Sequence, residues 1–149
     1  MKRRINAALL LIIPIVSIVF SCSKKDVIKI MPEQKYNFSL TLYDTDIDLP
    51  ENDRRSYYEV FIDKAESGRT TIGLESQKKI FEAKLTPDRH LVKIEKWILD
   101  ESQGRYIKLN NLYQPKPDFI YITIEAGKIS RVNVESSKYG TSRYTVIKE

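Results

Sequence analysis

The sequence predicts an all-β protein, and three observations favour this fold class. Apolar and polar residues alternate with a period of two in most segments after residue 35, as expected of strands with one buried face. Turn-forming residues interrupt this alternation at short intervals. Helical periodicity is absent, although residues 76–85 could alternatively hold a helix. About seven to nine short strands with this spacing indicate a single β-sandwich.

The first half of the domain contains four predicted strands. They span residues 36–43, 58–63, 70–74 and 81–85. Ser67-Gly68 predicts the turn between the second and third of them, because glycine readily adopts turn conformations. Thr86-Pro87-Asp88-Arg89 predicts the next turn, since proline fixes the backbone angle that its second position needs.

The second half continues with five predicted strands. They span residues 90–99, 105–109, 119–124, 129–135 and 144–148. Turn residues occupy 100–104, and a proline-containing loop is expected over 110–117. Ala126-Gly127-Lys128 predicts a tight hairpin in which residues 129–135 pair back on the preceding strand.

The strand that begins at His90 has two apolar phases. His90 and Ile94 face one way, whereas Leu91, Trp97 and Leu99 face the other. This pattern predicts that the far end of the strand changes face through a bulge. It leaves two roles open for Trp97, which is either part of the core between the sheets or an exposed anchor.

Two segments carry a family resemblance. Residues 85–94 read Leu-Thr-Pro-Asp-Arg-His-Leu-Val-Lys-Ile, and residues 119–129 read Phe-Ile-Tyr-Ile-Thr-Ile-Glu-Ala-Gly-Lys-Ile. Together they resemble the strand-turn-strand and the later hairpin of PEGA-type and related transthyretin-like sandwich domains. The resemblance covers about a third of the predicted mature chain. It implies an immunoglobulin-like or transthyretin-like sandwich in which a buried histidine, here His90, follows the turn.

The start of the chain predicts its location. A basic Met1–Arg4 segment precedes an apolar run, which ends before Cys22, the single cysteine. This arrangement resembles a bacterial lipoprotein signal peptide, which implies cleavage before Cys22 and lipidation of its side chain. The predicted organisation is therefore a signal peptide over 1–21, a lipidated N-terminus and tether over 22–34, and a β-sandwich over 35–149. An uncleaved transmembrane anchor is the alternative.

The leader also sets the expected compartment and charge. Ser23, rather than aspartate, follows Cys22, which in the lipoprotein resemblance implies an outer-membrane location in the cell envelope. Loss of Lys2, Arg3 and Arg4 would lower the net charge from +5 to +2, because 20 acidic residues remain. The basic and acidic residues are interspersed, so we expect no nucleic-acid binding. No pattern indicates a cofactor, and one cysteine excludes a disulfide within the chain.

Two further features are candidate sites. His90 is the sole histidine and lies at the start of a strand on the apolar phase, so we expect a core histidine bonded to the preceding turn. Asp44, Asp46 and Asp48 alternate in an acidic loop over 44–53 and could present oxygens to calcium. The loop lacks the glycine and the final glutamate of an EF-hand, so a solvated loop is the favoured interpretation.

Aromatic residues suggest a partner surface. The sequence contains nine tyrosines, and Tyr57, Phe61, Phe119 and Tyr121 fall on phases that we assign to the outward face of a sheet. Tyrosine is enriched at interfaces, because its ring buries area while its hydroxyl stays polar. The alternative is that loops or the second sheet cover these rings.

These features predict a non-enzymatic protein, because no arrangement of catalytic residues is evident. We expect an outer-membrane lipoprotein, anchored by its N-terminal lipid, that binds or organises a protein partner in the envelope. Small lipoproteins of trans-envelope secretion systems are similar in length, anchor and sandwich class, which offers an analogy of architecture. The alternative is a surface-exposed or periplasmic module for a small molecule, a glycan or a host protein.

Overall fold

A computed structural model describes residues 35–137 and 139–149 of the chain. The predicted signal peptide, Cys22 and the tether over 22–34 lie outside the described residues. Within the described residues no helix is both long and apolar enough to cross a membrane. The domain is all-β apart from one 3-10 turn, η1, at Pro50–Asn52.

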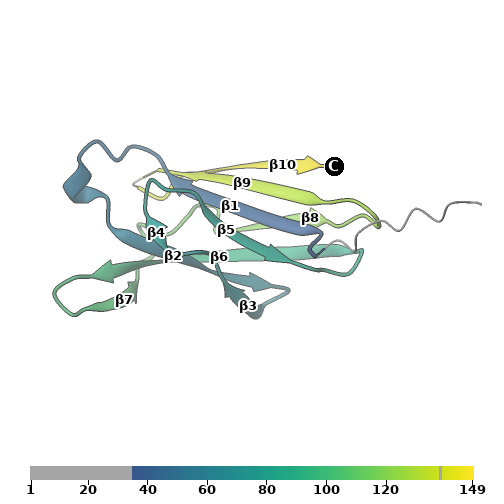
Figure 1. Ribbon diagram of the computed structural model, residues 1–149, viewed down its shortest axis with the longest axis horizontal. Helices are drawn as coiled ribbons and strands as arrows, with labels where there is room; N and C mark the ends of the chain where they lie inside the picture. Colours follow the sequence, from purple (N-terminus) through teal and green to yellow (C-terminus); the bar gives the residue numbers. More distant parts are fainter. Residues whose placement is uncertain (1–34, 138) are drawn as a thin grey trace, which may run out of the picture. The chain divides into compact units, whose positions relative to one another are not determined.

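The strands form two sheets that pack face to face (Figure 1). The four-stranded sheet has the order β10-β9-β1-β5 and consists of β1 (Phe38–Asp44), β5 (Lys79–Ala83), β9 (Ser130–Ser136) and β10 (Ser142–Lys148). The six-stranded sheet consists of β2 (Arg55–Ile62), β3 (Ala65–Arg69), β4 (Gly73–Leu74), β6 (Arg89–Asp100), β7 (Arg105–Lys108) and β8 (Phe119–Thr123). The prediction of an all-β sandwich is confirmed, with ten strands among the described residues.

Strand pairing places β2 and β6 at the centre of the six-stranded sheet. Strands β3 and β4 lie in succession along one side of β2, and β7 and β8 lie in succession along the opposite side of β6. In the other sheet, β1 is antiparallel to β5 but parallel to β9. Among the strands of the described residues, β10 pairs with β9 alone, and it therefore forms one edge of its sheet.

One apolar core joins the two sheets. Its buried members come from alternate positions of six strands and the residue after β8: Phe38, Leu40, Leu42, Tyr58, Val60, Ile62, Phe81, Val92, Ile94, Ile122, Ile124, Val132 and Val134. The alternation that predicted these strands therefore also identified their inward faces. Burial of this apolar surface is the main source of stability, because each buried aliphatic side chain contributes about 1.5–3 kcal/mol.

The turn after β2 differs from the prediction. Ser67-Gly68 lies inside β3, and the chain reverses instead at Asp63 and Lys64, whose φ angles are 52° and 72°. Two successive residues with positive φ form a turn whose twist matches that of a hairpin. Gly68, with a φ of 132°, lies where the pairing of β2 and β3 shifts register. The glycine therefore accommodates a bulge rather than a turn.

The predicted hairpin over 126–128 is also wrong. Strand β8 pairs with β6 in one sheet, whereas β9 pairs with β1 and β10 in the other. The turn at Gly127 therefore carries the chain from one sheet to the other. The alternation of apolar residues is the same in both arrangements, so it could not distinguish a hairpin from a crossing between sheets.

Strand β6 keeps one phase over its full length, which overturns the predicted change of face. Lys96 and Ile98 are buried on the same side as Ile94, whereas Trp97 is half-buried on the opposite side. The pairing with β2 runs from Val92 to Ile98 without a shift in register. Trp97 therefore lies on the outer face of the six-stranded sheet. The apparent change of phase came from Lys96, a charged residue at an inward position.

The loop over 109–117 joins the two sheets at their edges. The side-chain amide of Gln114 bonds to the backbone of Lys96 as a neighbouring strand would. Its Oε1 accepts from the Lys96 N–H at 2.7 Å, and its Nε2 donates to the carbonyls of Lys96 and Leu109 at 3.0 and 2.8 Å. The N–H of Lys116 donates to the carbonyl of Gly140 at 2.6 Å, in the turn between β9 and β10. Because Gln114 is buried, these bonds satisfy its amide and fix the loop.

Candidate functional site

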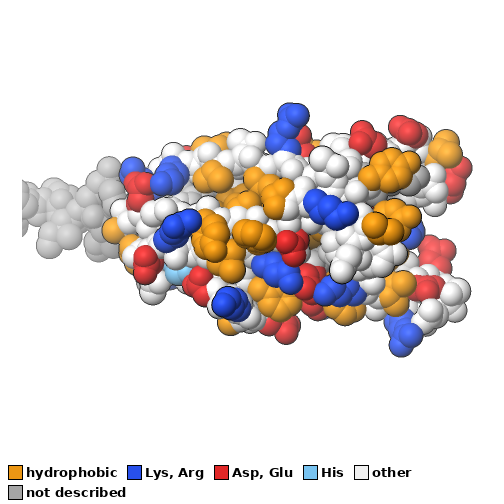
Figure 2. Space-filling view, turned by 180° about the vertical axis from the view of Figure 1, so that it is seen from behind, with side chains coloured by type: hydrophobic (Ala, Val, Ile, Leu, Met, Phe, Trp, Pro, Cys, Tyr) orange, Lys and Arg blue, Asp and Glu red, His pale blue; other side chains and the backbone are white. Residues whose placement is uncertain are grey.

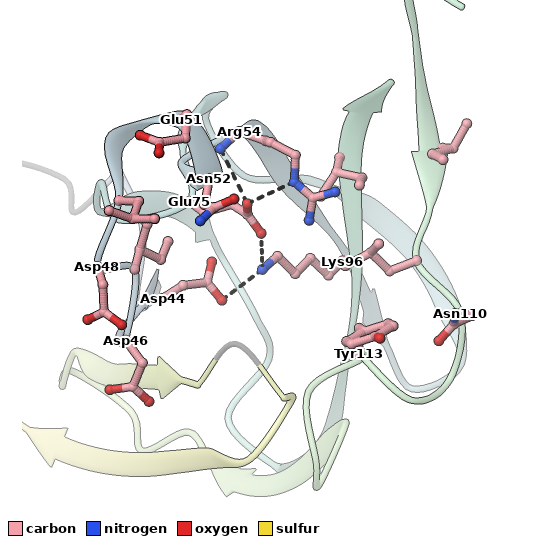
Figure 3. Close-up of a pocket in the computed structure, with 15 residues that line it drawn as sticks. Asp44, Asp46, Asp48, Glu51, Asn52, Arg54, Glu75, Lys96, Asn110 and Tyr113 are labelled. Atoms are coloured by element: carbon pink, nitrogen blue, oxygen red, sulfur yellow. Dashed lines mark hydrogen bonds and ion pairs between the residues drawn. The ribbon is translucent and has the colours of Figure 1, made fainter. Parts of the chain in front are cut away.

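A cleft of about 660 Å³ lies where β1 ends, beside the loop that follows β7 (Figure 3). Its lining comprises Asp44, Asp46, Ile47, Asp48, Leu49, Glu51, Asn52, Arg54, Glu75, Lys96, Ile98, Ile107, Leu109, Asn110 and Tyr113. The lining therefore combines charged side chains with apolar ones. Its size is in the range of small-molecule pockets.

The interior of the cleft holds a network of buried ion pairs. The Nζ of Lys96 lies 2.8 Å from Oδ1 of Asp44 and 2.7 Å from Oε1 of Glu75. The other carboxylate oxygen of Glu75 accepts from the backbone N–H and the Nε of Arg54, both at 3.3 Å. Figure 3 shows the carboxylates of Asp44 and Glu75 both pointing at the Nζ of Lys96. Lys96 is therefore neutralised by two carboxylates, which allows its burial.

The local structure fixes these partners. Asp44 is the last residue of β1, and its backbone N–H donates to the Glu75 carbonyl at 2.9 Å. The N–H of Glu75 in turn donates to the carbonyl of Arg54, just before β2. Two carboxylates from distant segments are thus held by main-chain bonds beside the inward side chain of Lys96.

Burial and charge act on the two carboxyl groups in different proportions. Burial is the strongest influence on Asp44 and raises the pKa of its carboxyl above the ordinary value, although Lys96 acts in the opposite direction. Burial would also raise the pKa of Glu75, but the charges of Lys96 and Arg54 outweigh it and lower that pKa. Glu75 is thus the more firmly ionised partner of Lys96.

A second buried lysine and a tyrosine surround the network. Lys79 is fully buried and donates through Nζ to the carbonyls of Glu75 and Gln77 at 2.9 and 3.0 Å. Burial lowers the pKa of Lys79 to about 8. The hydroxyl of Tyr58 lies 3.1 and 3.2 Å from the two carboxylate oxygens of Asp44, and burial raises the pKa of Tyr58 well above its ordinary value. Tyr58 therefore remains a neutral donor.

The structure does not bring together Asp44, Asp46 and Asp48, the three residues predicted as calcium candidates. Asp44 is turned inward and paired with Lys96, whereas Asp46 and Asp48 are exposed and point away from it (Figure 3). Among the described residues no group of three acidic, histidine or cysteine side chains is placed to hold a metal ion. The physical reason is that Asp44 ends a strand, so its side chain follows the inward phase of β1.

The predicted aromatic residues do share one face. Tyr57 lies opposite Trp97 in the register of β2 and β6, and Phe61 and Phe119 lie on either side of Lys93. All of these positions are on the outer face of the six-stranded sheet, as the alternation predicted. They nevertheless form two different environments, one at each end of that face.

At one end, Tyr57 is covered rather than exposed. Its ring stacks on Trp97 with centroids 6.0 Å apart and meets Tyr106 edge-on at 5.0 Å, while Arg69 lies over it. At the other end, Phe119 and Tyr121 are 46% and 56% exposed and contact each other edge-to-face. Of the four predicted surface residues, Tyr57 is therefore a packed residue and Phe119 and Tyr121 are the most accessible.

His90 occupies the structural position expected of it. It is buried at the start of β6, and its Nε2 lies 2.9 Å from the carbonyl oxygen of Thr86 in the preceding turn. Its Nδ1 lies 2.7 Å from the carboxylate of Asp63, in the turn after β2. Both partners are acceptors, so the bond to Thr86 and the pairing with Asp63 raise the pKa of His90.

Sequence reasoning missed Arg54, Glu75 and Lys96, which form the centre of the cleft. One signal was present, because Lys96 has the same parity as Val92, Ile94 and Ile98. A lysine in phase with core residues indicates a buried cation that needs carboxylate partners. Which carboxylates supply that charge depends on the packing of the two sheets.

Comparisons with known proteins do not assign the chain to a family. No protein-family model, no curated protein sequence and no solved structure matches the chain. The structure therefore defines a class, a two-sheet β-sandwich with a charged cleft and an aromatic outer face. The resemblance to PEGA-type and transthyretin-like domains stays a prediction.

Proposed function

We propose that this chain is a non-enzymatic lipoprotein of the outer membrane, whose sandwich binds a protein partner in the cell envelope. The supporting observation is the exposed pair Phe119 and Tyr121 on the rigid outer face of the six-stranded sheet. Strand β8, which carries the pair, is drawn faint in Figure 1 because it lies toward the rear. Figure 2 presents that rear side, where hydrophobic side chains gather with lysine and arginine side chains between them.

The composition of this patch suits a protein interface. Arg89 lies 4.3 Å above the ring of Tyr121, and Lys93 lies 5.9 Å from the ring of Phe61. Aromatic rings next to arginine are the residues that most often dominate binding energy. Strands β6 and β8 hold the rings in place, so binding would order few side chains.

The proposed mechanism is tethering. A lipid on Cys22 would confine the sandwich to the membrane surface and raise its effective concentration near an envelope partner. In its sharper form, the chain is a subunit of a trans-envelope secretion complex. The leader sequence and the architecture support this form, and the patch gives it a contact surface to test.

In-cell crosslinking of the full tagged chain, followed by mass spectrometry, tests the proposal. A Phe119→Ser/Tyr121→Ser variant should lose one or two defined envelope proteins, because it removes the rings that fill the contact. The matched control is Ile72→Ser/Leu112→Ser, which removes two exposed side chains elsewhere and should keep those partners. Cys22→Ala should lose them through loss of the anchor. Equal capture by all variants would refute a role for the patch.

The cleft supports a second candidate, a ligand-binding module for a small molecule or glycan. Its volume, its apolar lining residues and the exposed ring of Tyr113 at its lining are the specific observations. A thermal-shift screen of small molecules and glycans against the wild type and Tyr113→Ala would separate the two candidates. A ligand that stabilises only the wild type would favour this function, whereas no stabilisation across the screen would favour the protein interface.

A further inference from the structure

At the start of β10 the N–H of Ser142 donates to the carbonyl of Lys116 at 3.0 Å. From Arg143 onward, no strand among the described residues covers the outer edge of β10, whereas the other sheet edges in that part of the chain are covered or short. Strand β10 has seven residues, contains no proline or glycine, and has no residue with positive φ (Figure 1). Val146 and Ile147 are 46% and 42% exposed. Long, regular strand edges pair readily with another strand, and proteins normally block them.

The other edges are blocked or short. The outer side of β5 is occupied, because Ile80 accepts from the N–H of Thr71 at 3.0 Å and donates to its hydroxyl at 3.1 Å. Strand β3 contains a bulge, and β4 and β7 have two and four residues. Strand β8 is apolar but has five residues and no charge to select a register.

The hydrogen bonds of β10 determine which residues face outward. Ile129 and Glu149 exchange both backbone bonds, at 2.9 and 3.0 Å, at the end of the β9–β10 ladder. Antiparallel ladders alternate between bonded and non-bonded pairs, so every second residue before Glu149 bonds to β9. The backbone N–H and C=O groups of Tyr144, Val146 and Lys148 therefore point away from β9, toward the open edge of the sheet.

We propose that two copies of this chain pair through β10, antiparallel, with Val146 on the twofold axis. This register places the outward groups of Tyr144, Val146 and Lys148 opposite those of Lys148, Val146 and Tyr144 in the second copy. A continuous eight-stranded sheet results, and the contact is isologous, as in most dimers.

Charge complementarity selects this register. With Val146 on the axis, Arg143 of each copy lies opposite Glu149 of the other, and both are on the outer face of the sheet. A register centred on Thr145 would also satisfy the backbone, but it would place Arg143 opposite Ile147. Opposite charges that face each other across strands are favourable, so the register centred on Val146 has two ion pairs that its neighbour lacks. Glu149 would then bridge Arg143 of the second copy and Arg131, which lies 3.1 Å away in its own copy.

Membranes from cells that produce the full chain allow the pairing to be tested by disulfide crosslinking. Directly bonded residues of an antiparallel pair have Cα atoms ~5.5 Å apart, within the ~4.4–6.8 Å that a disulfide spans. Mild oxidation should therefore convert the Val146→Cys variant into a covalent dimer. Thr145→Cys and Ile147→Cys should give no more covalent dimer than the unaltered chain. The dimer yield of the unaltered chain measures any contribution of Cys22. Tyr121→Cys tests the rival edge β8.

A charge-swap experiment separates register from folding defects. Two differently tagged chains, both with Val146→Cys, would carry Arg143→Glu and Glu149→Arg respectively. In a homodimer of either variant, residues 143 and 149 would carry the same charge and face each other across the axis. The mixed dimer restores both ion pairs. The crosslinked mixed dimer should therefore exceed either homodimer by roughly tenfold. Equal yields of mixed and like dimers, crosslinking through Tyr121→Cys, or no dimer with Val146→Cys would overturn the proposal.

Discussion

The two halves of the inward face of β6 satisfy burial in different ways. Near its start, Val92 and Ile94 pack in the apolar core with no polar atom to satisfy. Two residues further on, Lys96 occupies the same face and is held by Asp44 and Glu75. The comparison shows that strand phase, rather than hydrophobicity, decides which side chains point inward. A charged side chain at such a position then needs partners from elsewhere in the fold.

The largest effect should come from breaking the charged half. Lys96→Met leaves the carboxylates of Asp44 and Glu75 buried without their cation, so the free energy of unfolding should fall by about 3–5 kcal/mol. Urea denaturation measures this change. The triple variant Asp44→Asn/Glu75→Gln/Lys96→Met removes all three charges and should recover a large part of the loss. A triple variant less stable than Lys96→Met would contradict the account of unpaired charge.

Truncation in the apolar core that contains Val92 and Ile94 should cost about as much or slightly less. Leu40 is fully buried in β1, and Leu40→Ala removes packed methyl groups and leaves a cavity, with an expected loss of about 2–5 kcal/mol. The same urea titration measures it. Unlike Lys96→Met, this loss should not change with salt concentration, because no ionised group is affected. A salt-dependent loss would show that the two halves are not independent.

The turn that borders Gln114 should give an intermediate effect. A Cβ at Gly140 would overlap the carbonyl oxygen of Gln114, and the φ of 83° already disfavours other residues. Gly140→Ala should therefore reduce stability by about 1–3 kcal/mol. Gly127→Ala is the matched control, because its φ is 75° but its Cβ would meet open space. Equal melting temperatures for both variants would show that only the φ angle matters.

A smaller effect concerns pH and the histidine at the start of β6. Because the pKa of His90 is raised in the folded state, its stabilising contribution is complete below the unfolded value of ~6.5 and is lost as the pH rises through the folded pKa. The free energy of unfolding should therefore decline with rising pH above ~6.5. His90→Gln should remove this decline in a series of urea titrations. A wild type that gains stability over this range would contradict the assignment.

The smallest effect should separate the two ends of the outer face. Tyr121→Ser should change stability by no more than about 0.5 kcal/mol, because its ring is largely exposed. Tyr57→Ser should cost more, since that ring is covered by Trp97 and Tyr106. Thermal denaturation of both variants measures the difference. Similar losses would mean that Tyr121 is structural, which would weaken its proposed role in binding.

The sequence by itself determined most of the strands and their inward residues. Alternation identified Phe38, Leu40 and Leu42 as core residues, because strand side chains alternate whatever the pairing partner. It also placed His90 in a bond with its preceding turn, which is a contact over four residues. These features depend on local spacing, so local reasoning was sufficient.

The tertiary structure decided which strands pair and where charge is buried. The parallel pairing of β1 with β9 and the separation of β8 from β9 depend on which apolar faces meet in the core. Lys96 bonds to Asp44, which lies 52 positions earlier in the sequence, and no local pattern predicts this contact. Local periodicity fixes the direction of a side chain, whereas its partner is fixed only when two sheets pack together.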